Sequence, residues 1–263
     1  MQLQVIQWNI SARSDPDEIA RYLTGCIPND KPFIICLQEV IKSSFQVLKT
    51  NLPADAMYYR LHLRPRGTHE GRNRALGVAI FGFNLTGVSC SLVDRSVFPE
   101  RALDATFCLN QEKIRILNFH SLTGVDYKKA KSSNFASLAD HLQANPNIDF
   151  MCFDANEPRI DSLFAEKREF YDNRDLGAKA ALLMGAKPSH NLHDALVQYL
   201  LSQEEPEDRN PLATSFITGK THRRYDHVYA HKSWRVVDIE YRYDDAIRHT
   251  SDHAVVVGLF TKL

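Results

Sequence analysis

Side chains able to bind a metal ion or transfer a proton follow several apolar runs of this chain. They are Asn9, Gln38 with Glu39, His120, Asp154 with Asn156, and Asp252 with His253. A polar group buried without a partner costs roughly 2–7 kcal/mol. One such strand end is ordinary, but a series of them predicts that the strand ends converge on one site.

The spacing of Asp154 and Asn156 suits a metal site, because alternate residues of an extended segment share a face. Oxygen-bearing side chains on one face fit a hard cation such as Mg²⁺, which binds few carboxylates and several waters. A structural alternative stays open, in which the tripeptide forms an Asx turn leading into Pro158. Likewise, Gln38-Glu39 could begin a helix and Asp252-His253 could cap the start of a strand.

Hydrophobic periodicity predicts the elements that position these side chains. Strands are expected over residues 3–8, 33–37, 75–81, 102–109, 114–119, 148–153, 225–230, 236–241 and 254–260. Helices are expected over residues 14–23, 43–50, 128–143 and 191–201, the first opened by Ser14 and Asp17 in a capping arrangement. This order predicts a strand-rich sandwich with helices outside, folded as a single domain over residues 1–263.

The amino-acid composition restricts the kinds of molecule that the chain is expected to bind. The 263 residues include 32 Lys+Arg and 32 Asp+Glu, so the formal net charge at pH 7 is zero. Such a chain has no overall field that would draw it onto nucleic acid or an anionic membrane, and polyanion binding must come from local patches. The five cysteines show no CxxC spacing, and no secretory leader or long apolar segment is evident. We therefore expect a cytoplasmic protein with reduced thiols and no membrane contact.

Short motifs in a fixed order give the chain a family resemblance. It resembles the endonuclease/exonuclease/phosphatase superfamily of deoxyribonuclease I-like, metal-dependent phosphoesterases. The matching segments are Gln7-Trp8-Asn9-Ile10, Leu37-Gln38-Glu39-Val40, Asn118-Phe119-His120-Ser121, Phe153-Asp154-Ala155-Asn156, Tyr225-Asp226-His227-Val228 and Ser251-Asp252-His253. Each motif is short, but their order and separation over nearly the whole chain make the resemblance specific.

The resemblance implies an α+β fold, a four-layer α/β/β/α sandwich of two mainly antiparallel sheets flanked by helices. The site would lie at one end of the sheets. Glu39 would be the principal ligand of Mg²⁺ or Mn²⁺, with Asn9 and Asp252 as further metal ligands. Ser11 stands where several branches of the family carry an aspartate, which argues against a second metal site near Asn9.

The resemblance also implies catalytic roles. Asp154 would orient or deprotonate the attacking water, and Asn156 would hold the phosphate or the water. Asp226 would pair with His253 and favour its protonated form, which can contact a phosphate oxygen. His120 would bind phosphate or act as the general acid for the leaving group.

Basic side chains gather in two loops that family members place at the rim of the site. The charge runs alone fit a solvated surface equally well. Beside a phosphoesterase site, however, they favour contact with substrate phosphates, and Arg101 matches a further basic position that contacts phosphate in several members. The expected substrate-binding residues are therefore Arg101, Arg64, Arg66, Arg72, Arg74, Arg223 and Arg224.

These features predict a Mg²⁺-dependent phosphodiesterase that acts by in-line attack of water. The leading hypothesis is a nuclease or DNA-end-processing enzyme whose partner is nucleic acid, DNA more than RNA. The alternative is a phosphatase or phosphodiesterase acting on a small molecule or lipid headgroup, of the inositol phosphate or sphingomyelin type. A third hypothesis is a silent binding module on the same scaffold, which would have no need of the complete set of motifs. The sequence does not indicate the oligomeric state.

Overall fold

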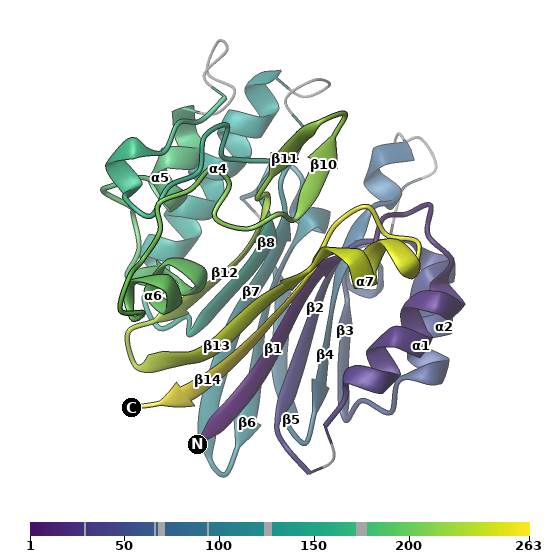
Figure 1. Ribbon diagram of the computed structural model, residues 1–263. Helices are drawn as coiled ribbons and strands as arrows, with labels where there is room; N and C mark the ends of the chain where they lie inside the picture. Colours follow the sequence, from purple (N-terminus) through teal and green to yellow (C-terminus); the bar gives the residue numbers. More distant parts are fainter. Residues whose placement is uncertain (29, 66, 68–71, 94, 124–127, 172–177) are drawn as a thin grey trace.

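Two six-stranded sheets pack face to face and carry helices on their outer faces (Figure 1). The computed structural model describes residues 1–28, 30–65, 67, 72–93, 95–123, 128–171 and 178–263. The first sheet contains, in spatial order, β13 (Trp234–Arg242), β14 (Val255–Lys262), β1 (Gln2–Asn9), β2 (Phe33–Val40), β4 (Gly77–Phe83) and β3 (Ala56–Tyr59). The second sheet contains β5 (Thr86–Leu92), β6 (Ala102–Leu109), β7 (Glu112–His120), β8 (Phe150–Asp154), β12 (Asp226–His231) and β9 (Leu192–Asp194).

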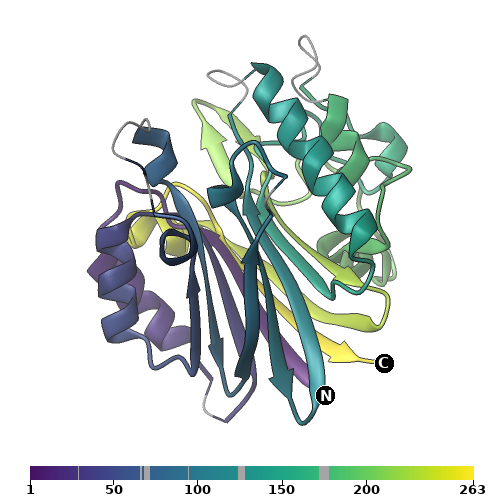
Figure 2. The ribbon, with the colours of Figure 1, turned by 180° about the vertical axis from the view of Figure 1, so that it is seen from behind.

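The longer helices lie on opposite sides of the sandwich (Figure 2). Helices α1 (Pro16–Cys26) and α2 (Lys42–Asn51) cover the first sheet, and α4 (Lys128–Ala144) covers the second. The shorter elements are α3 (Arg60–Leu63), α5 (Ala181–Met184), α6 (Ala195–Leu201), α7 (Tyr243–Arg248), the 3-10 turns η1 (Arg72–Ala75), η2 (Pro99–Arg101), η3 (Ala165–Lys167) and η4 (Ala178–Ala180), and the hairpin β10 (Phe216–Thr218) with β11 (Thr221–Arg223). Within the described chain, no helix combines the length and apolarity needed to cross a lipid bilayer.

The apolar side chains form cores on both faces of each sheet. Alternate residues of β1 serve different cores, because successive side chains of a strand point to opposite faces. Leu3 packs between the sheets with Ile116, whereas Trp8 packs outward with Phe45 of α2. On the other side of the molecule, Phe135 of α4 packs on the second sheet. This layering confirms the predicted four-layer α/β/β/α sandwich.

A parallel pair of strands lies at the centre of each sheet, β1 beside β2 and β7 beside β8. The other pairings within the two sheets are antiparallel. Parallel neighbours need a crossover connection, which α1 and α4 provide. The chain termini meet at one end of the sandwich, where the backbone N–H of Lys262 donates to the Met1 carbonyl. The carboxyl ends of the four parallel strands therefore lie at the other end.

The predicted strands and the predicted helices 43–50 and 128–143 are confirmed with small shifts at their ends, and the other two predicted helices need correction. The cap of α1 is Asp15, whose side chain accepts from the Asp17 backbone N–H, and not Ser14. Ser14 instead donates to the Thr250 carbonyl at 2.5 Å. The predicted helix 191–201 begins only at Ala195, because the preceding three residues pair with β12 as strand β9.

Several short strands were not predicted. β3 has four residues and β9 has three, which is too little for a periodic pattern. β5 lies at a sheet edge and reads Thr86-Gly87-Val88-Ser89-Cys90, a mixture of small and polar residues with little burial. Such strands form because they pair with an adjacent strand of the sheet, and a single segment of sequence does not reveal that partner.

Candidate active site

The carboxyl ends of the central strands bring predicted site residues from both sheets together. Asn9 ends β1, His120 ends β7, Asp154 ends β8, and Glu39 is the penultimate residue of β2. His120 and Asp154 are direct neighbours in the second sheet. Asn9 Nδ2 donates to Asp154 Oδ2 across the sheets at 2.9 Å. One site is therefore assembled from both halves of the sandwich.

An irregularity near the end of β2 places Glu39 at the site. The pairing of β2 with β4 shifts register between Leu37 and Val40, and Glu39 has a φ of 56°. A non-glycine residue in that left-handed region costs about 1–3 kcal/mol, and such residues cluster at functional sites. Glu39 Oε2 accepts from the Ala12 backbone N–H at 3.1 Å, and the side chain keeps 25% of its surface exposed. The carboxylate is thus fixed and accessible.

Asp154 is buried and held by amide groups. Besides the bond from Asn9 to Oδ2, its Oδ1 accepts from the Asn156 backbone N–H at 2.9 Å. Burial raises the pKa of Asp154 to about 7, and nearby Asp226 acts in the same direction while His253 opposes it. A carboxylate with a pKa near neutrality can accept a proton from an attacking water.

Asp226 and His253 form a buried pair. His253 Nδ1 lies 2.8 Å from Asp226 Oδ2, and His253 Nε2 lies 4.0 Å from Asp154 Oδ2. Burial alone would lower the pKa of His253, but the carboxylates of Asp226 and Asp154 outweigh it and raise that pKa to about 10. Trp8 Nε1 donates to the His253 carbonyl at 2.9 Å and anchors its backbone. The ring is therefore held as an imidazolium.

A series of hydrogen-bonded, buried amide side chains orients Asp226. Gln38 Nε2 donates to Asn118 Oδ1 at 2.7 Å, and Gln7 Nε2 donates to Gln38 Oε1 at 2.8 Å. Gln7 Nε2 also donates to Asp226 Oδ1 at 3.0 Å. All four side chains are fully buried. Because connected buried polar groups rigidify one another, this network fixes Asp226 toward His253.

His120 has a cationic neighbour instead of a carboxylate on its Nδ1 side. Arg101 Nη1 lies 3.2 Å from His120 Nδ1, and His120 Nε2 lies 3.5 Å from Asp154 Oδ2. Burial lowers the pKa of His120 well below its usual range, and Arg101 and His253 act in the same direction. His120 is therefore neutral, in contrast to His253.

The converging side chains line a cleft of about 560 Å³. Its walls include Glu39, His120, Asp154, Asn156, Asp252 and His253. Asn9 and Asp226 lie just behind this wall, where they hold Asp154 and His253. The structure thus brings together all the residues for which the sequence predicted catalytic or metal-binding roles.

The cleft fits a hard divalent cation. Glu39 offers a fixed, accessible carboxylate, and Asp252 lies exposed on the same wall. Mg²⁺ is usually held by one or two carboxylates and several waters, which this arrangement allows. Asp154, Asp226 and His253 also present ligand atoms within 4.8 Å of one another. A protonated imidazole cannot bind a cation, however, so Glu39 is the better anchor.

Solved structures with the same layers match nearly the whole chain. The human Nocturnin catalytic domain with bound sulfate anion is 20% identical, with a TM-score of 0.67 over 100% of this chain and 95% of that one. D. rerio TDP2 complexed with a single-strand DNA product is 16% identical, with a TM-score of 0.66 over 99% of each chain. An endonuclease/exonuclease/phosphatase from Bacteroides vulgatus is 13% identical, with a TM-score of 0.64 over 100% of each chain.

The chain therefore shares its fold with these solved structures, among them proteins described as endonuclease/exonuclease/phosphatase. No family model and no curated protein sequence matches the chain. The fold that the resemblance implied is therefore confirmed by the arrangement of sheets and helices, over nearly the full length of the chain.

In this fold, arginines of the first basic loop, residues 60–74, lie around a buried glutamate, Glu100. Both oxygens of Glu100 lie 2.8 Å from Arg74 Nη1, and Glu100 Oε2 lies 3.5 Å from Arg60 Nη2 and 3.7 Å from Arg64 Nη1. Glu100 is 0% exposed. Arg74 is thus bound to Glu100 within the protein, whereas the Arg64 side chain keeps 37% of its surface exposed. Neither is among the residues that line the cleft.

The remaining predicted substrate contacts fall in different places. Arg66 lies outside the described residues, as does the side chain of Arg72. Arg223 is half-buried and donates to the Arg159 carbonyl. Arg101 is 4% exposed and lies behind His120, so it does not face the cleft as predicted.

The predicted substrate contact of Arg224 is wrong, because this side chain is buried. Its Nε and Nη2 donate to Asp161 at 2.7 and 2.9 Å, and its Nη1 and Nη2 donate to Asp194 at 3.0 and 2.8 Å. Arg168 Nη2 also donates to Asp194, at 2.9 Å. Adjacent residues of an extended chain point to opposite sides, so Arg224 turns inward where Arg223 does not.

Replacing Asp194 with asparagine is expected to lower the free energy of unfolding at pH 7 by about 3–5 kcal/mol, the usual cost of removing one partner of a buried ion pair. The loss can be measured as a shift of the urea midpoint, with Asp140→Asn on the exposed face of α4 as the matched control. Equal midpoints for Asp194→Asn and the wild type at pH 7 would contradict the structural role.

The buried ion pairs of Asp194 with Arg224 and Arg168 also predict that acid destabilises the folded protein. Burial would raise the pKa of Asp194, but Arg224 and Arg168 outweigh it and hold that pKa well below its usual range. The native state therefore binds fewer protons than the unfolded state near pH 4. This contribution to stability is complete above the unfolded pKa of about 3.9 and is lost as the pH falls below it. Asp194→Asn should accordingly lose less stability than the wild type on acidification from pH 5 to pH 3.

Arg13 and Phe216 line the cleft but were not predicted. Arg13 is exposed in the loop after β1, and among the described residues it is the one lysine or arginine on the cleft wall. The Phe216 ring lies 4.7 Å from the His253 ring between centroids. A basic residue closely following Asn9 was the available signal for Arg13. For Phe216, the available signal was its position shortly before the Asp226 motif.

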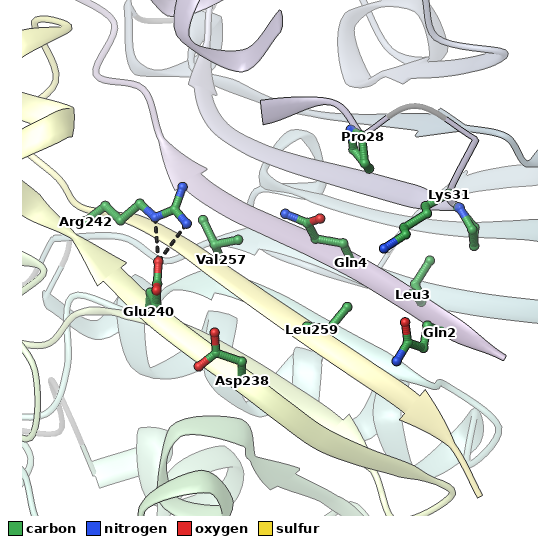
Figure 3. Close-up of a pocket in the computed structure, with 11 residues that line it drawn as sticks. Gln2, Leu3, Gln4, Pro28, Lys31, Asp238, Glu240, Arg242, Val257 and Leu259 are labelled. Atoms are coloured by element: carbon green, nitrogen blue, oxygen red, sulfur yellow. Dashed lines mark hydrogen bonds and ion pairs between the residues drawn. The ribbon is translucent and has the colours of Figure 1, made fainter. Parts of the chain in front are cut away.

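A second, smaller depression of about 210 Å³ lies on the outer face of the first sheet (Figure 3). Lys31 lies on one side, and Asp238, Glu240 and Arg242 lie on the other. Arg242 is bound to Glu240 at 2.6 Å. The described residues that line it include no histidine, cysteine or hydroxyl group, so this depression lacks the imidazole groups of the cleft.

Proposed function

We propose that this protein is a divalent-metal-dependent phosphoesterase that hydrolyses phosphodiesters, as a nuclease or DNA-end-processing enzyme. The observation that carries the proposal is the convergence, in one cleft, of an accessible Glu39, a buried Asp154 and the hydrogen-bonded Asp226–His253 pair. The same fold in D. rerio TDP2 accompanies a bound single-strand DNA product, and in human Nocturnin a bound sulfate.

Phosphodiester hydrolysis needs charge neutralisation, an aligned water and a stabilised leaving oxygen. Glu39, with Asn9 and Asp252 nearby, would hold Mg²⁺ or Mn²⁺, which when bound neutralises phosphate charge and polarises the phosphoryl oxygen. Asp154 accepts a proton from the attacking water, with its carboxylate aimed by Asn9 and the Asn156 backbone.

The remaining groups bind the phosphate. The His253 imidazolium offers Nε2–H beside Asp154, where it can donate to a non-bridging phosphate oxygen. The Asn156 side chain lines the same wall and can hold the phosphate or the water. Charge-assisted hydrogen bonds of this kind are roughly twice as strong as neutral ones.

Nucleic acid is the proposed substrate because the cleft combines a cation with an aromatic ring. Arg13 can contact a neighbouring backbone phosphate, and Phe216 offers a ring face on which a base can stack. Base stacking on an aromatic side chain typically contributes about 1–3 kcal/mol. DNA is preferred to RNA in this proposal because of the DNA-bound TDP2 neighbour.

A second candidate is a phosphatase or phosphodiesterase acting on a small molecule or lipid headgroup. The observation that favours it is that Arg60 and Arg74 are held at Glu100 and do not line the cleft, where a long polyanion would contact them. The cleft volume also suffices for a small phosphoester.

Turnover on parallel substrates separates the two candidates. Wild type and His253→Ala would be compared with Mg²⁺ on single- and double-stranded DNA, RNA, a tyrosyl-DNA end, an inositol polyphosphate and bis-p-nitrophenyl phosphate. The proposal expects the highest kcat/KM on a DNA substrate, with the activity lost in the variant. Activity restricted to the inositol polyphosphate or the small diester would instead establish the second candidate.

A further inference from the structure

We propose that Arg101 fixes the tautomer of His120, so that His120 acts as a neutral hydrogen-bond donor to the substrate and not as a proton-transferring general acid. Arg101 is then a positioning residue. The inference deepens the proposed phosphoesterase function and rests on it for the identity of the acceptor. It replaces the direct phosphate contact that the sequence indicated for Arg101.

The first step follows from the donors of arginine. A guanidinium carries five N–H donors and no acceptor. Arg101 Nη1 lies 3.2 Å from His120 Nδ1, and the two residues are 4% and 2% exposed. For this contact to be a hydrogen bond, Nδ1 must carry its lone pair. The single ring proton of His120 then resides on Nε2.

The opposite edge of the ring agrees with that assignment. His120 Nε2 lies 3.5 Å from Asp154 Oδ2, which is an acceptor. A proton on Nε2 thus meets a carboxylate oxygen, whereas the lone pair of Nδ1 meets a cation. With the proton on Nδ1 instead, an N–H donor would face the Arg101 guanidinium, and a lone pair would face the Asp154 carboxylate.

Arg101 is itself held in place. Its backbone N–H donates to the Phe98 carbonyl at 2.9 Å within the turn η2, and its Nη1 also approaches the Ser121 carbonyl at 3.4 Å. The preceding residue, Glu100, is anchored by Arg74. The guanidinium therefore stays at the Nδ1 edge of His120.

The two histidines of the cleft are consequently bound in opposite ways. His253 has the Asp226 carboxylate at Nδ1, which favours an imidazolium. His120 has the Arg101 guanidinium at Nδ1, which excludes a protonated ring. A neutral imidazole can stabilise negative charge on a substrate oxygen by donating Nε2–H, as in the neutral histidine of triosephosphate isomerase. The Nε2–H bond of His120 stays intact, so the proton for the leaving oxygen comes from solvent or from the His253 imidazolium.

The ring nitrogens report the tautomer directly in the wild-type protein. Long-range ¹H–¹⁵N spectra of histidine-labelled protein would be recorded, with the His120 signals assigned from their loss in His120→Gln. The expected pattern is a protonated Nε2 and an unprotonated Nδ1. A proton on Nδ1, alone or on both nitrogens, overturns the proposal. The tautomer is read in the wild-type protein, so this test needs no known substrate, and His120→Gln serves only for the assignment.

Matched variants test the consequence for turnover. Arg101→Lys keeps a donor-only cation and should preserve the Nε2–H pattern, whereas Arg101→Met should lose it and reduce kcat by roughly 10- to 100-fold, as is typical when a group that orients a site residue is removed. His120→Gln can accept from Arg101 through its oxygen and donate through its amide, so it should retain more activity than His120→Ala.

Arg115→Met is the control, because Arg115 binds Asp104 at 2.7 and 2.9 Å and does not line the cleft. Its kcat should match that of the wild type. Equal activity of the His120 glutamine and alanine variants, or of the Arg101 lysine and methionine variants, overturns the proposal. A wild type without activity on any phosphoester overturns the proposed function alone, since the tautomer is measured independently.

Discussion

Replacing Glu39 with glutamine is expected to reduce kcat for phosphodiester hydrolysis by roughly 10³-fold and to raise the metal concentration needed for half-maximal activity. A bound divalent cation contributes several kcal/mol to the transition state, and each 1.36 kcal/mol is a tenfold change in rate. The glutamine side chain has nearly the same shape and keeps an oxygen for the Ala12 backbone N–H. The change therefore removes charge from the cleft and leaves the irregular end of β2 in place.

The measurement is turnover across a Mg²⁺ titration, beside Mn²⁺ binding followed by isothermal titration calorimetry. Glu204→Gln, on an exposed loop, is the matched control and should match the wild type in both. Unchanged binding and turnover in Glu39→Gln would remove this residue as the metal ligand. Unchanged binding with lost turnover would keep a catalytic role for Glu39 but not the role assigned here.

Replacing Asp226 with asparagine is expected to lower kcat by about 10³- to 10⁴-fold while the protein stays folded. The carboxylate accepts from Gln7 through Oδ1 and lies 2.8 Å from His253 Nδ1 through Oδ2. An amide has only one oxygen, so it cannot satisfy both donors. His253 also loses the negative charge that favours its protonated form, and the same change in a serine-protease triad costs about 10⁴-fold.

Kinetic assays and thermal unfolding together test this prediction. Asp238→Asn on β13 removes a carboxylate outside the cleft and should leave kcat unchanged. The double variant Asp226→Asn/His253→Ala should be no slower than His253→Ala, because both changes act through one imidazole. Additive losses would show that Asp226 acts independently of His253.

Sequence reasoning located the site because its chemistry is local to the strand ends. Asn9, Glu39, His120 and Asp154 each follow an apolar run, and the parallel pairing of β1 with β2 and β7 with β8 collects those ends. The period of the apolar residues was also enough to predict a strand-rich sandwich with helices outside, and the family resemblance implied its four layers. Those features are encoded within short segments of chain.

The ion pairs were beyond this reasoning, because their partners are distant in sequence. Arg224 and Asp161 are 63 residues apart, and Arg74 and Glu100 are 26 apart. A run of basic residues looks the same whether it faces solvent or a buried carboxylate. The left-handed backbone of Glu39 also has no sequence signal, because nothing in its residue type favours a positive φ.

The hydrogen bonds among the buried amides next to Asp226 were likewise not predictable from the sequence. Gln7, Gln38 and Asn118 lie within the motifs that suggested the family, yet their types alone do not reveal that they bond to one another. Their connection arises where two sheets meet, and it turns three ordinary polar residues into a support for Asp226.

Metal-dependent turnover at the cleft tests the central claim most directly. The protein would be freed of metal with EDTA, and hydrolysis of the phosphoester panel would be followed before and after addition of Mg²⁺ or Mn²⁺, with His253→Ala in parallel. The account predicts no turnover without metal, restoration by either ion on at least one phosphodiester, and loss of that restored activity in the variant. Equal rates with and without metal, or equal rates in wild type and His253→Ala, would contradict it.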